Sequence, residues 1–230
     1  NMVPDHAEAV FEVENTEEFE DKYNNYMKDK DYPVDMQVED NIVRLIAKGI
    51  SAHGSTPEKG ENAISNLMKV LGNILDGQCD LCDFINLYNE RIGFKHHGED
   101  IGCGLEDDVS GKLNFNPGLI KFEDGKIILT INVRYPIKSS SKEVYDGIRR
   151  NLEGTKLELV EGKGDTKPLY VPKDNFLVEK LMEVYRKETG DTESQPITIG
   201  GGTYARAMEN AVAFGPMLPG QEDVAHQKDE

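Results

Sequence analysis

The segment LNFNPGLIKFEDGKIILTINVRY, residues 113–135, decides the fold. It contains two apolar runs, at 113–122 and 126–135, which flank the pair Asp124-Gly125. An Asp-Gly pair between apolar runs is typical of a tight β-hairpin, because its turn needs residues that accept positive φ. We therefore expect an antiparallel hairpin here, with Arg134 at the end of its second strand.

The segments before the hairpin mix strand and helix patterns. Alternating and apolar runs predict strands at 7–13, 34–38 and 41–50. Apolar residues at helical spacing predict helices at 16–28, from about 57 to 75, and at 80–92. Ser55 and Glu58 have the spacing of a capping box, and Pro57 suits a first helical turn, so we expect the second helix to begin there. Residues 95–108 predict a polar loop, with His96 and His97 on the surface.

After the hairpin the pattern predicts a helix at 139–152, a strand at 156–161 and a Gly- and charge-rich linker at 162–167. This order predicts an α+β fold, a ferredoxin-like arrangement with helices on one face of a mainly antiparallel sheet. Beyond the linker, an apolar piece at 168–171, a helix at 174–188 and the C-terminal stretch indicate an α/β segment. We place the domain boundary between residues 166 and 167.

Composition excludes several kinds of partner. With 230 residues, the chain is long enough to bury a core. It has 26 Lys and Arg against 43 Asp and Glu, a formal net charge of −17. Nucleic-acid phosphates need Lys and Arg, so we expect no nucleic-acid partner. The charge also disfavours anionic membranes, and no apolar run approaches the ~20 residues of a membrane span. We expect an acidic, soluble, cytoplasmic protein.

The three cysteines, Cys79, Cys82 and Cys103, are too few for a secreted disulfide scaffold, and their number is odd. Cys79 and Cys82 form a CxxC pair, but a zinc ribbon needs a second pair, which the sequence lacks. We expect all three to be ordinary reduced thiols.

The C-terminal stretch PITIGGGTYARAMENAVAFGPMLPGQEDVAHQKDE, residues 196–230, predicts a binding loop. Gly200, Gly201 and Gly202 let the backbone approach a ligand closely. A glycine turn that leads into a helix also offers N–H groups to an anion such as a carboxylate. His226 lies among acidic residues, as metal-ligating imidazoles often do. The alternative is a plain glycine turn with His226 on the surface. A phosphate loop is not expected, because no Lys-Ser/Thr follows the glycines.

Four ordered motifs carry a resemblance to a known family: NMVPD at 1–5, SAHGSTPEKGENA at 51–63, NVRYP at 132–136, and TIGGGTYAR with AFGPMLPGQEDVAHQKDE at 198–230. Together they resemble the bacterial peptidase V-type dipeptidases. These belong to the two-domain, co-catalytic zinc peptidases that include aminoacylases and carboxypeptidase-G-type enzymes. The resemblance covers essentially the whole chain.

The resemblance implies a layout and a set of roles. Residues 1–166 would be a lid, equivalent to a dimerisation domain in relatives, and residues 167–230 the last part of the catalytic domain. His53 would reach the scissile carbonyl. Asn1 and Arg134 would hold the substrate, with the arginine on its C-terminal carboxylate. The glycines at 200–202 would lie beside the substrate backbone, and His226 would bind zinc.

The resemblance also has a large departure. The other zinc ligands and the glutamate general base of the family precede NMVPD and are absent here, so we expect a piece of a longer polypeptide. The complete enzyme would hydrolyse dipeptides with two zinc ions, or with manganese. The chain alone would bind zinc weakly and be inactive. His6, His96 and His97 lack the family's HxD context.

Other interpretations remain open at this stage. Without the resemblance, His53 is equally a loop or strand-end histidine, and Arg134 a solvated rim residue. The chain could be a ferredoxin-like module that binds or senses a small molecule, or a deacylase of the same family, such as an aminoacylase. The long insertion between the helix ending near residue 75 and the hairpin favours a monomeric lid over a dimerising one.

Overall fold

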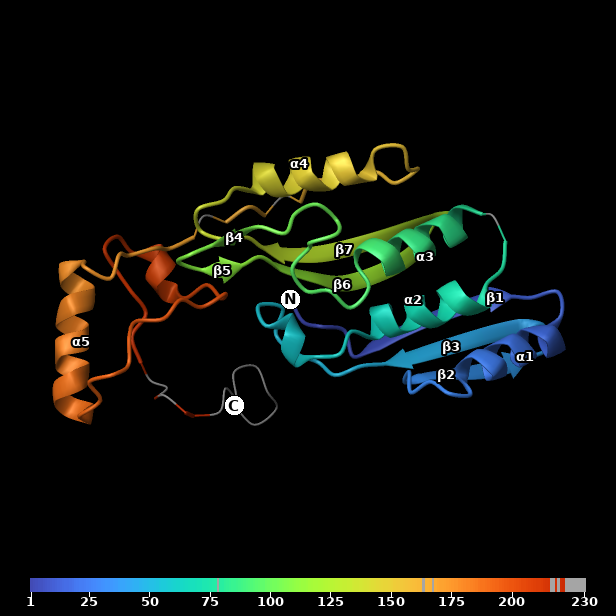
Figure 1. Cartoon of the computed structure of the whole chain (residues 1–230), viewed down its shortest axis with the longest axis horizontal. Helices are drawn as coiled ribbons and strands as arrows, with labels where there is room; N and C mark the ends of the chain where they lie inside the picture. The colour runs from blue at the N-terminus through green and yellow to red at the C-terminus, as the bar shows by residue number, and fades with distance from the viewer. Residues whose placement is uncertain (78, 163, 167, 216–217, 219, 222–230) are drawn as a thin grey trace. The chain divides into compact units, whose positions relative to one another are not determined.

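The computed structural model describes residues 1–77, 79–162, 164–166, 168–215, 218, 220 and 221. They form two compact units, Asn1–Gly162 and Lys163–Glu230, coloured along the chain in Figure 1. The boundary lies at the start of the Gly- and charge-rich segment 162–167. The assignment of the first unit as a lid and the second as a catalytic segment stays a prediction.

The first unit combines helices with antiparallel sheets, so the predicted α+β class is confirmed. Its longer strands are β1 (His6–Glu12), β2 (Val34–Glu39), β3 (Ile42–Lys48), β6 (Asn114–Glu123) and β7 (Lys126–Arg134). Two short strands, β4 (Glu106–Asp107) and β5 (Gly111–Lys112), pair within the segment before β6. Its helices are α1 (Thr16–Met27), the 3-10 turn η1 (Pro57–Lys59), α2 (Ala63–Ile74), α3 (Asp80–Arg91) and α4 (Ser141–Leu152).

The strands form separate sheets rather than one continuous sheet. One has the order β1-β3-β2 and another is the β6-β7 hairpin, and every pairing is antiparallel. The hairpin turns at Asp124 and Gly125, with φ of 50° and 73°, so the expected turn is confirmed. The finer ferredoxin-like description stays a prediction.

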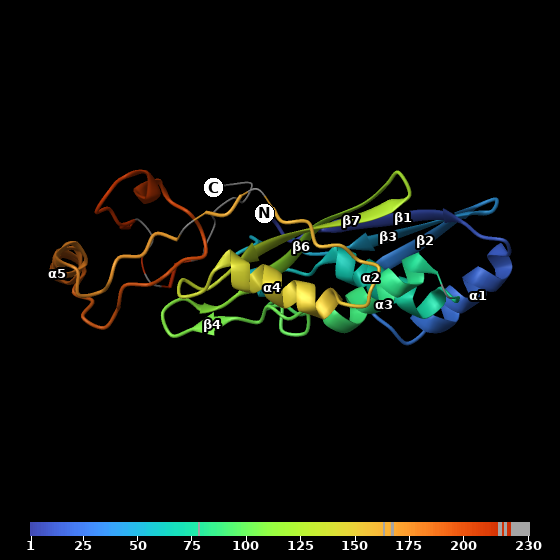
Figure 2. The same cartoon turned by 90° about the horizontal axis from the view of Figure 1, so that it is seen from above.

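The helices share one side of this unit, as Figure 2 shows for α1 to α4 against the strands. Helix α2 packs on the β1-β3-β2 sheet and on α3. Its apolar stripe is almost fully buried. The core joins α2 to residues from both sheets and from α3 and α4, including Leu45, Leu67, Ile85, Phe115 and Val144. Burial of these side chains removes apolar surface from water and is the main stabilising term.

Helix α4 packs against the loop that contains Gly102. At the point of contact, neither backbone segment carries a side chain. A Cβ added to Gly147 would lie 1.9 Å from the carbonyl oxygen of Gly102, and one added to Gly102 would lie 2.6 Å from the Gly147 oxygen. Gly102 also has a positive φ of 89°. Glycine at both positions therefore lets α4 pack directly on the loop backbone.

The predicted strand at 156–161 is wrong. The segment forms no strand, although Leu157 and Leu159 are half-buried against the core and their neighbours are exposed. The alternation therefore correctly predicted which side chains face inward. A strand also needs a neighbouring backbone to pair with, and alternation cannot indicate that partner.

The predicted start of the second helix is also wrong. Pro57 begins the 3-10 turn η1, which has no side-chain cap, and Gly60 follows it in extended conformation. Helix α2 begins at Ala63, where the Asn62 side chain accepts hydrogen bonds from the Ile64 and Ser65 amides at 2.9 and 3.4 Å. Gly60 interrupts the helical pattern, and Asn62 is a strong N-cap residue.

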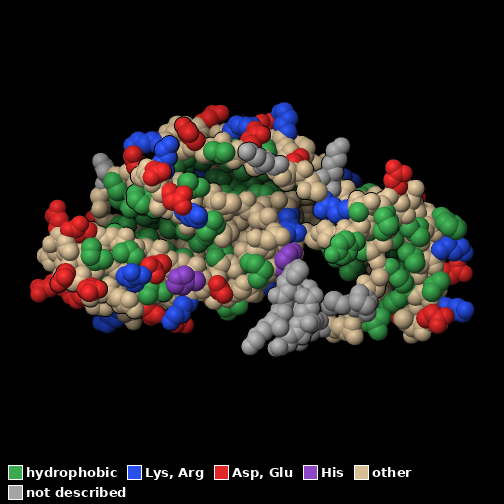
Figure 3. All heavy atoms as spheres, turned by 180° about the vertical axis from the view of Figure 1, so that it is seen from behind, with side chains coloured by type: hydrophobic (Ala, Val, Ile, Leu, Met, Phe, Trp, Pro, Cys, Tyr) green, Lys and Arg blue, Asp and Glu red, His purple; other side chains and the backbone are tan. Residues whose placement is uncertain are grey.

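The second unit contains helix α5 (Phe176–Thr189) and the 3-10 turn η2 (Tyr204–Ala207). The helix expected at 174–188 is confirmed within two residues. Among its described residues no strand is present, so the α/β class of this unit stays a prediction. Helix α5 has no buried residue, and Phe176 and Val184 are 73% and 52% exposed. Hydrophobic side chains accordingly gather on the face of this unit seen in Figure 3.

Across the described part of the chain, no helix has both the length and the apolar character that a membrane crossing requires.

Asn62 provides a stability test of the fold. Asn62→Ala removes the cap of α2 and the amide that donates to the Pro117 carbonyl at 2.8 Å. We expect it to lower the free energy of unfolding by about 2–4 kcal/mol, the sum of a lost cap and a buried acceptor left unpaired. Asn15→Ala is the control, because Asn15 caps only the exposed start of α1 and should cost about 1 kcal/mol. Urea unfolding measures both, and equal losses would contradict the buried role.

Candidate substrate-binding site

The open end of the β6-β7 hairpin carries a polar face. Asn114 pairs with Arg134 and Asn116 pairs with Asn132, so these four side chains share one face of the ribbon. Phe115, between them on β6, points to the opposite face and is 1% exposed in the core. The same alternation that buries one face of the hairpin thus collects amides and a guanidinium on the other.

The N-terminal segment and the loop after β3 lie together at this end. Met2 and His53 form an antiparallel bridge. The Val3 amide donates to the Ala52 carbonyl, and the Gly54 amide to the Asn1 carbonyl, both at 2.8 Å.

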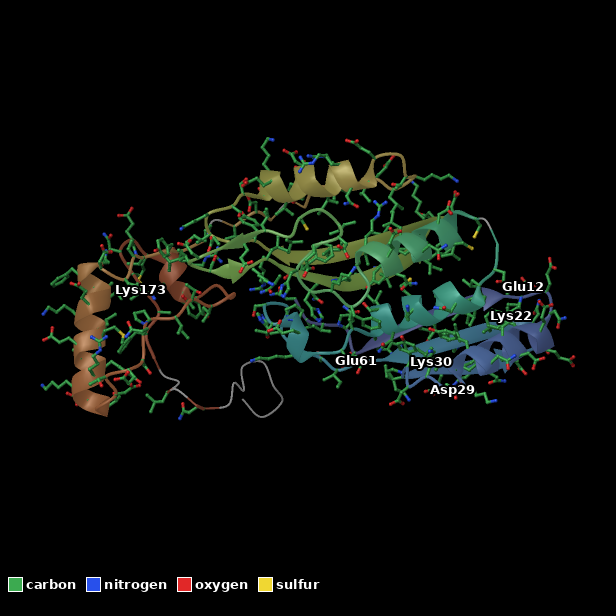
Figure 4. The ribbon with its side chains drawn as sticks, viewed as in Figure 1. Glu12, Lys22, Asp29, Lys30, Glu61 and Lys173 are labelled. Atoms are coloured by element: carbon green, nitrogen blue, oxygen red, sulfur yellow. The ribbon has the colours of Figure 1, made fainter. Side chains whose placement is uncertain are left out.

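Backbone hydrogen bonds also close the loop that carries His53. Ile50 and Glu61 exchange two of them, at 2.9 and 2.8 Å. Glu61, labelled in Figure 4, accepts from the Asn66 side chain of α2 at 2.8 Å. The loop is therefore anchored at its base to α2.

Arg134 is held by neutral amides. Its Nη2 donates to the Asn1 side-chain oxygen at 2.9 Å, and its Nε donates to the Asn132 side-chain oxygen at 3.3 Å. Partial burial lowers the pKa of Arg134, because desolvation disfavours the charged form. The guanidinium still remains charged at neutral pH. These contacts orient the guanidinium.

Ser55 contacts one ring nitrogen of His53. The Ser55 amide, which can only donate, points to His53 Nδ1 at 3.4 Å, and the Ser55 hydroxyl lies 2.6 Å from the same nitrogen. In a neutral ring that accepts this bond at Nδ1, the proton is on Nε2. The Ser55 carbonyl in turn accepts from the Asn114 side chain at 2.5 Å, which ties this turn to β6.

Two buried asparagines hold together the segments that carry the site. Asn116 donates to the Met2 carbonyl at 2.9 Å, and Asn62 donates to the Pro117 carbonyl and, at 3.5 Å, to the Asn116 side chain. Their side chains are almost fully enclosed, at 1% and 8% exposed. Each buried amide is hydrogen-bonded, as burial of polar groups requires. They connect the N-terminal segment, β6 and the start of α2.

The structure thus brings three of the predicted site residues together. Asn1 and Arg134 are hydrogen-bonded, and Asn1 is also bonded through its backbone to the residue after His53. Their catalytic and binding roles stay predictions. Gly200, Gly201 and Gly202 belong to the second unit, and His226 lies outside the described residues.

The described structure does not explain why Gly201 and Gly202 are glycines. Gly201 has no left-handed φ, and no atom of the described residues lies within 4 Å of the place where its Cβ would stand. At Gly202 a Cβ would meet only the flexible side chain of Arg206, at 2.5 Å. Within this unit, the turn therefore does not require glycine at either position.

The described residues do not make a metal site. Among them, no group of three or more His, Cys, Asp or Glu side chains lies close enough to hold an ion. A catalytic zinc needs three protein ligands and a water. The predicted ligand His226 is not among these residues, so the prediction of zinc or manganese is untested.

Sequence reasoning missed the residues that position the predicted ones. Asn132 precedes Arg134 by two residues, a spacing that places both on one face of a strand. Asn114 and Asn116 lie opposite them across a hairpin that was itself predicted. This register could have identified all three, whereas the contact of Asn62 with Asn116, 54 residues away, has no local signal.

The relatives found by comparison with known proteins carry the same kind of name. No family model matches the chain. It is 36% identical over 235 residues to "Putative dipeptidase YtjP" of Bacillus subtilis, covering all of this chain and 49% of that protein. It is also 36% identical over 233 residues to a "Putative dipeptidase" of Staphylococcus epidermidis, with the same coverage of each chain. The chain spans about half the length of the curated relatives it matches.

Asn116 tests the support beneath the site. Asn116→Ala removes the buried amide that donates to the Met2 carbonyl and accepts from Asn62, so we expect a loss of about 1–3 kcal/mol in unfolding free energy. Asn73→Ala is the control, because Asn73 bonds only within its own helix at an exposed position, and it should change stability by about 0.5 kcal/mol or less. Urea unfolding of both variants checks this, and similar small losses would show that Asn116 does not hold the N-terminal segment.

Proposed function

We propose that this chain forms the substrate-binding lid and the C-terminal catalytic segment of a metal-dependent dipeptidase. The observation that carries the proposal is the cluster of Asn1, His53 and Arg134, which come from three separate parts of the chain and lie together at one end of the hairpin. The similarity of the whole chain to proteins named as dipeptidases supports it.

In this proposal Arg134 binds the C-terminal carboxylate of the dipeptide. A guanidinium presents a planar fork of donors that matches a carboxylate and can bind it in a bidentate manner. Asn132 and Asn1 fix the orientation of this fork. A partly buried cation also attracts an anion more strongly than a fully solvated one, because less water screens the pair. Such a site selects peptides with a nearby free C-terminus.

His53 donates a hydrogen bond to the carbonyl oxygen of the scissile bond. When Nδ1 of the neutral ring accepts from the Ser55 amide, the proton lies on Nε2 and can be donated. Negative charge develops on that oxygen in the tetrahedral intermediate, and a donor already in place stabilises this charge more than the ground state. Ser55 holds the imidazole ring in position, and the hydrogen bond from Asn114 on β6 holds Ser55.

The second unit would complete the site from the catalytic domain. Its exposed apolar helix α5 suits packing within a larger domain, since exposed apolar clusters often mark interaction surfaces. We propose that the loop at 200–202 lies beside the substrate backbone and that His226 ligates a metal ion. Zinc or manganese would activate the attacking water and polarise the carbonyl. The described residues lack the donors for such an ion, so we propose that the chain alone is inactive. The cytoplasmic location and monomeric state stay predictions.

Arg134→Lys tests carboxylate recognition in the 230-residue chain itself. We expect dipeptides to bind the wild type more tightly than the corresponding dipeptide amides, by about tenfold for one charged hydrogen-bonded pair. In Arg134→Lys this preference should largely disappear, because an ammonium cannot make the bidentate contact. NMR titration with both ligands measures it. An unchanged preference for the free carboxylate in the variant would contradict the role of Arg134.

His53→Ala tests the second role in a longer polypeptide that hydrolyses dipeptides. We expect turnover to fall by about 10²-fold, the effect of removing one oxyanion donor, with the bound metal content unchanged. His6→Ala, at an exposed position of β1, is the matched control and should retain full activity. Unchanged turnover in His53→Ala would rule the role out. Cleavage of N-acyl amino acids in place of dipeptides would instead support the deacylase alternative.

A further inference from the structure

The CxxC pair lies at the start of helix α3 with its sulfurs in contact. Cys79 is the N-cap residue and Cys82 is the third residue of the helix. The Sγ atoms are 2.7 Å apart, and the Cys82 amide donates to the Cys79 sulfur at 3.2 Å. The Cys79 sulfur therefore takes the place of the side-chain oxygen of an ordinary N-cap. This position favours a negatively charged sulfur, because the helix dipole and the capping N–H both stabilise an anion.

The two thiols differ in access and in acidity. Cys79 is exposed, whereas Cys82 is 9% exposed. The hydrogen bond from the Cys82 side chain lowers the pKa of Cys79, and the same bond, together with burial, raises the pKa of Cys82. Solvent thus reaches the more acidic thiol, and the less acidic thiol lies directly behind it. This is the arrangement of an attacking and a resolving cysteine.

We propose that Cys79 and Cys82 form a thiol–disulfide exchange site for small disulfides, independent of the proposed peptidase site. The Cys79 thiolate attacks one sulfur of a disulfide RSSR, which forms a mixed disulfide and releases one RS⁻. The Cys82 thiol then loses its proton to solvent and attacks the Cys79 sulfur, which releases the second RS⁻. The pair is oxidised to a disulfide by two electrons, and RSSR is reduced to two RSH once the released thiolates take up protons.

The charges around the pair indicate which disulfides react best. Asp76, Asp80 and Asp83 each lie within three residues of one of the two cysteines in sequence. Lys22 pairs with Asp76 at 2.7 Å, and Lys156 pairs with Asp80. Asp83 adds a further negative charge, and the chain carries −17 in total. A negative field concentrates cations and repels anions. The site therefore prefers disulfides with positive charge over those with carboxylates.

A metal site is the other chemistry that a CxxC pair can support. Among the residues described, no third His, Cys, Asp or Glu joins Cys79 and Cys82 in a group that could hold an ion. A structural zinc site needs four ligands. The contact of the two sulfurs suits an internal disulfide better than a site with two ligands.

Cystamine, a small dicationic disulfide, tests the proposal on the 230-residue chain. Intact mass and peptide mapping should show that the wild type loses two hydrogen atoms, links Cys79 to Cys82 and keeps no adduct. Cys82→Ser should retain one cysteamine on Cys79, because no thiol remains to release it. Cys79→Ser should react at least about tenfold more slowly than Cys82→Ser, since the remaining thiol is buried and less acidic.

Cys103 is an internal control for folding in every sample. It is 1% exposed, and burial raises its pKa to about 12. It should stay unmodified in native protein and react only in urea, so a variant that fails to fold would reveal itself. Oxidised glutathione, which is anionic, should react more slowly than cystamine at low salt, and the difference should shrink as salt screens the charges.

Three results would overturn the proposal. The first is a wild-type chain that retains stable cysteamine adducts without an internal disulfide. The second is equal reaction rates for Cys79→Ser and Cys82→Ser with Cys103 protected in both. The third is oxidised glutathione reacting faster than cystamine at low salt, which would refute the preference for cationic disulfides. None of these results bears on Arg134 or His53.

Discussion

Two buried asparagines, Asn62 and Asn116, link the β1-β3-β2 sheet to the β6-β7 hairpin beside the apolar core that both share. The β1-β3-β2 sheet and the β6-β7 hairpin share no backbone pairing in the structure. Asn62 caps α2, which packs on the first sheet, and it donates to the hairpin at Pro117. Asn116 donates from the hairpin to Met2. A buried amide left unpaired costs more than a paired one contributes, so these bonds constrain the geometry more strongly than their net energies suggest.

Local chemistry made much of this unit predictable. The Asp-Gly turn defines the hairpin, and the apolar stripe of 63–74 defines the helix that forms the centre of the core. The prediction failed at two segments. Residues 156–161 have the burial pattern of a strand but no pairing. Ser55 has the spacing of a helix cap but instead lies against His53. The first pattern lacks a partner strand, and the second is overruled because Gly60 is extended and Asn62 caps the helix.

The same distinction applies to the candidate site. Asn1, His53 and Arg134 were selected by resemblance, since neither spacing nor charge joins positions 1, 53 and 134. The structure adds the amides that orient them, and these lie at positions set by strand alternation. Alternation thus predicts which neighbours share a face, whereas the approach of the N-terminal segment to the hairpin is decided by packing across the whole unit.

In the second unit, the helix was predictable but the burial of its side chains was not. Its helix was predicted from periodicity, but its apolar side chains remain exposed, so periodicity alone did not indicate what covers them.

The face-to-face glycines of α4 and its neighbouring loop have an evolutionary consequence. Gly102 and Gly147 each fill the space that a side chain on the other would need. A substitution at one therefore cannot be rescued by a change at the other, because neither has an atom left to remove. Descendant sequences must keep both glycines or move the helix away and repack Val144 and Ile148 beneath it.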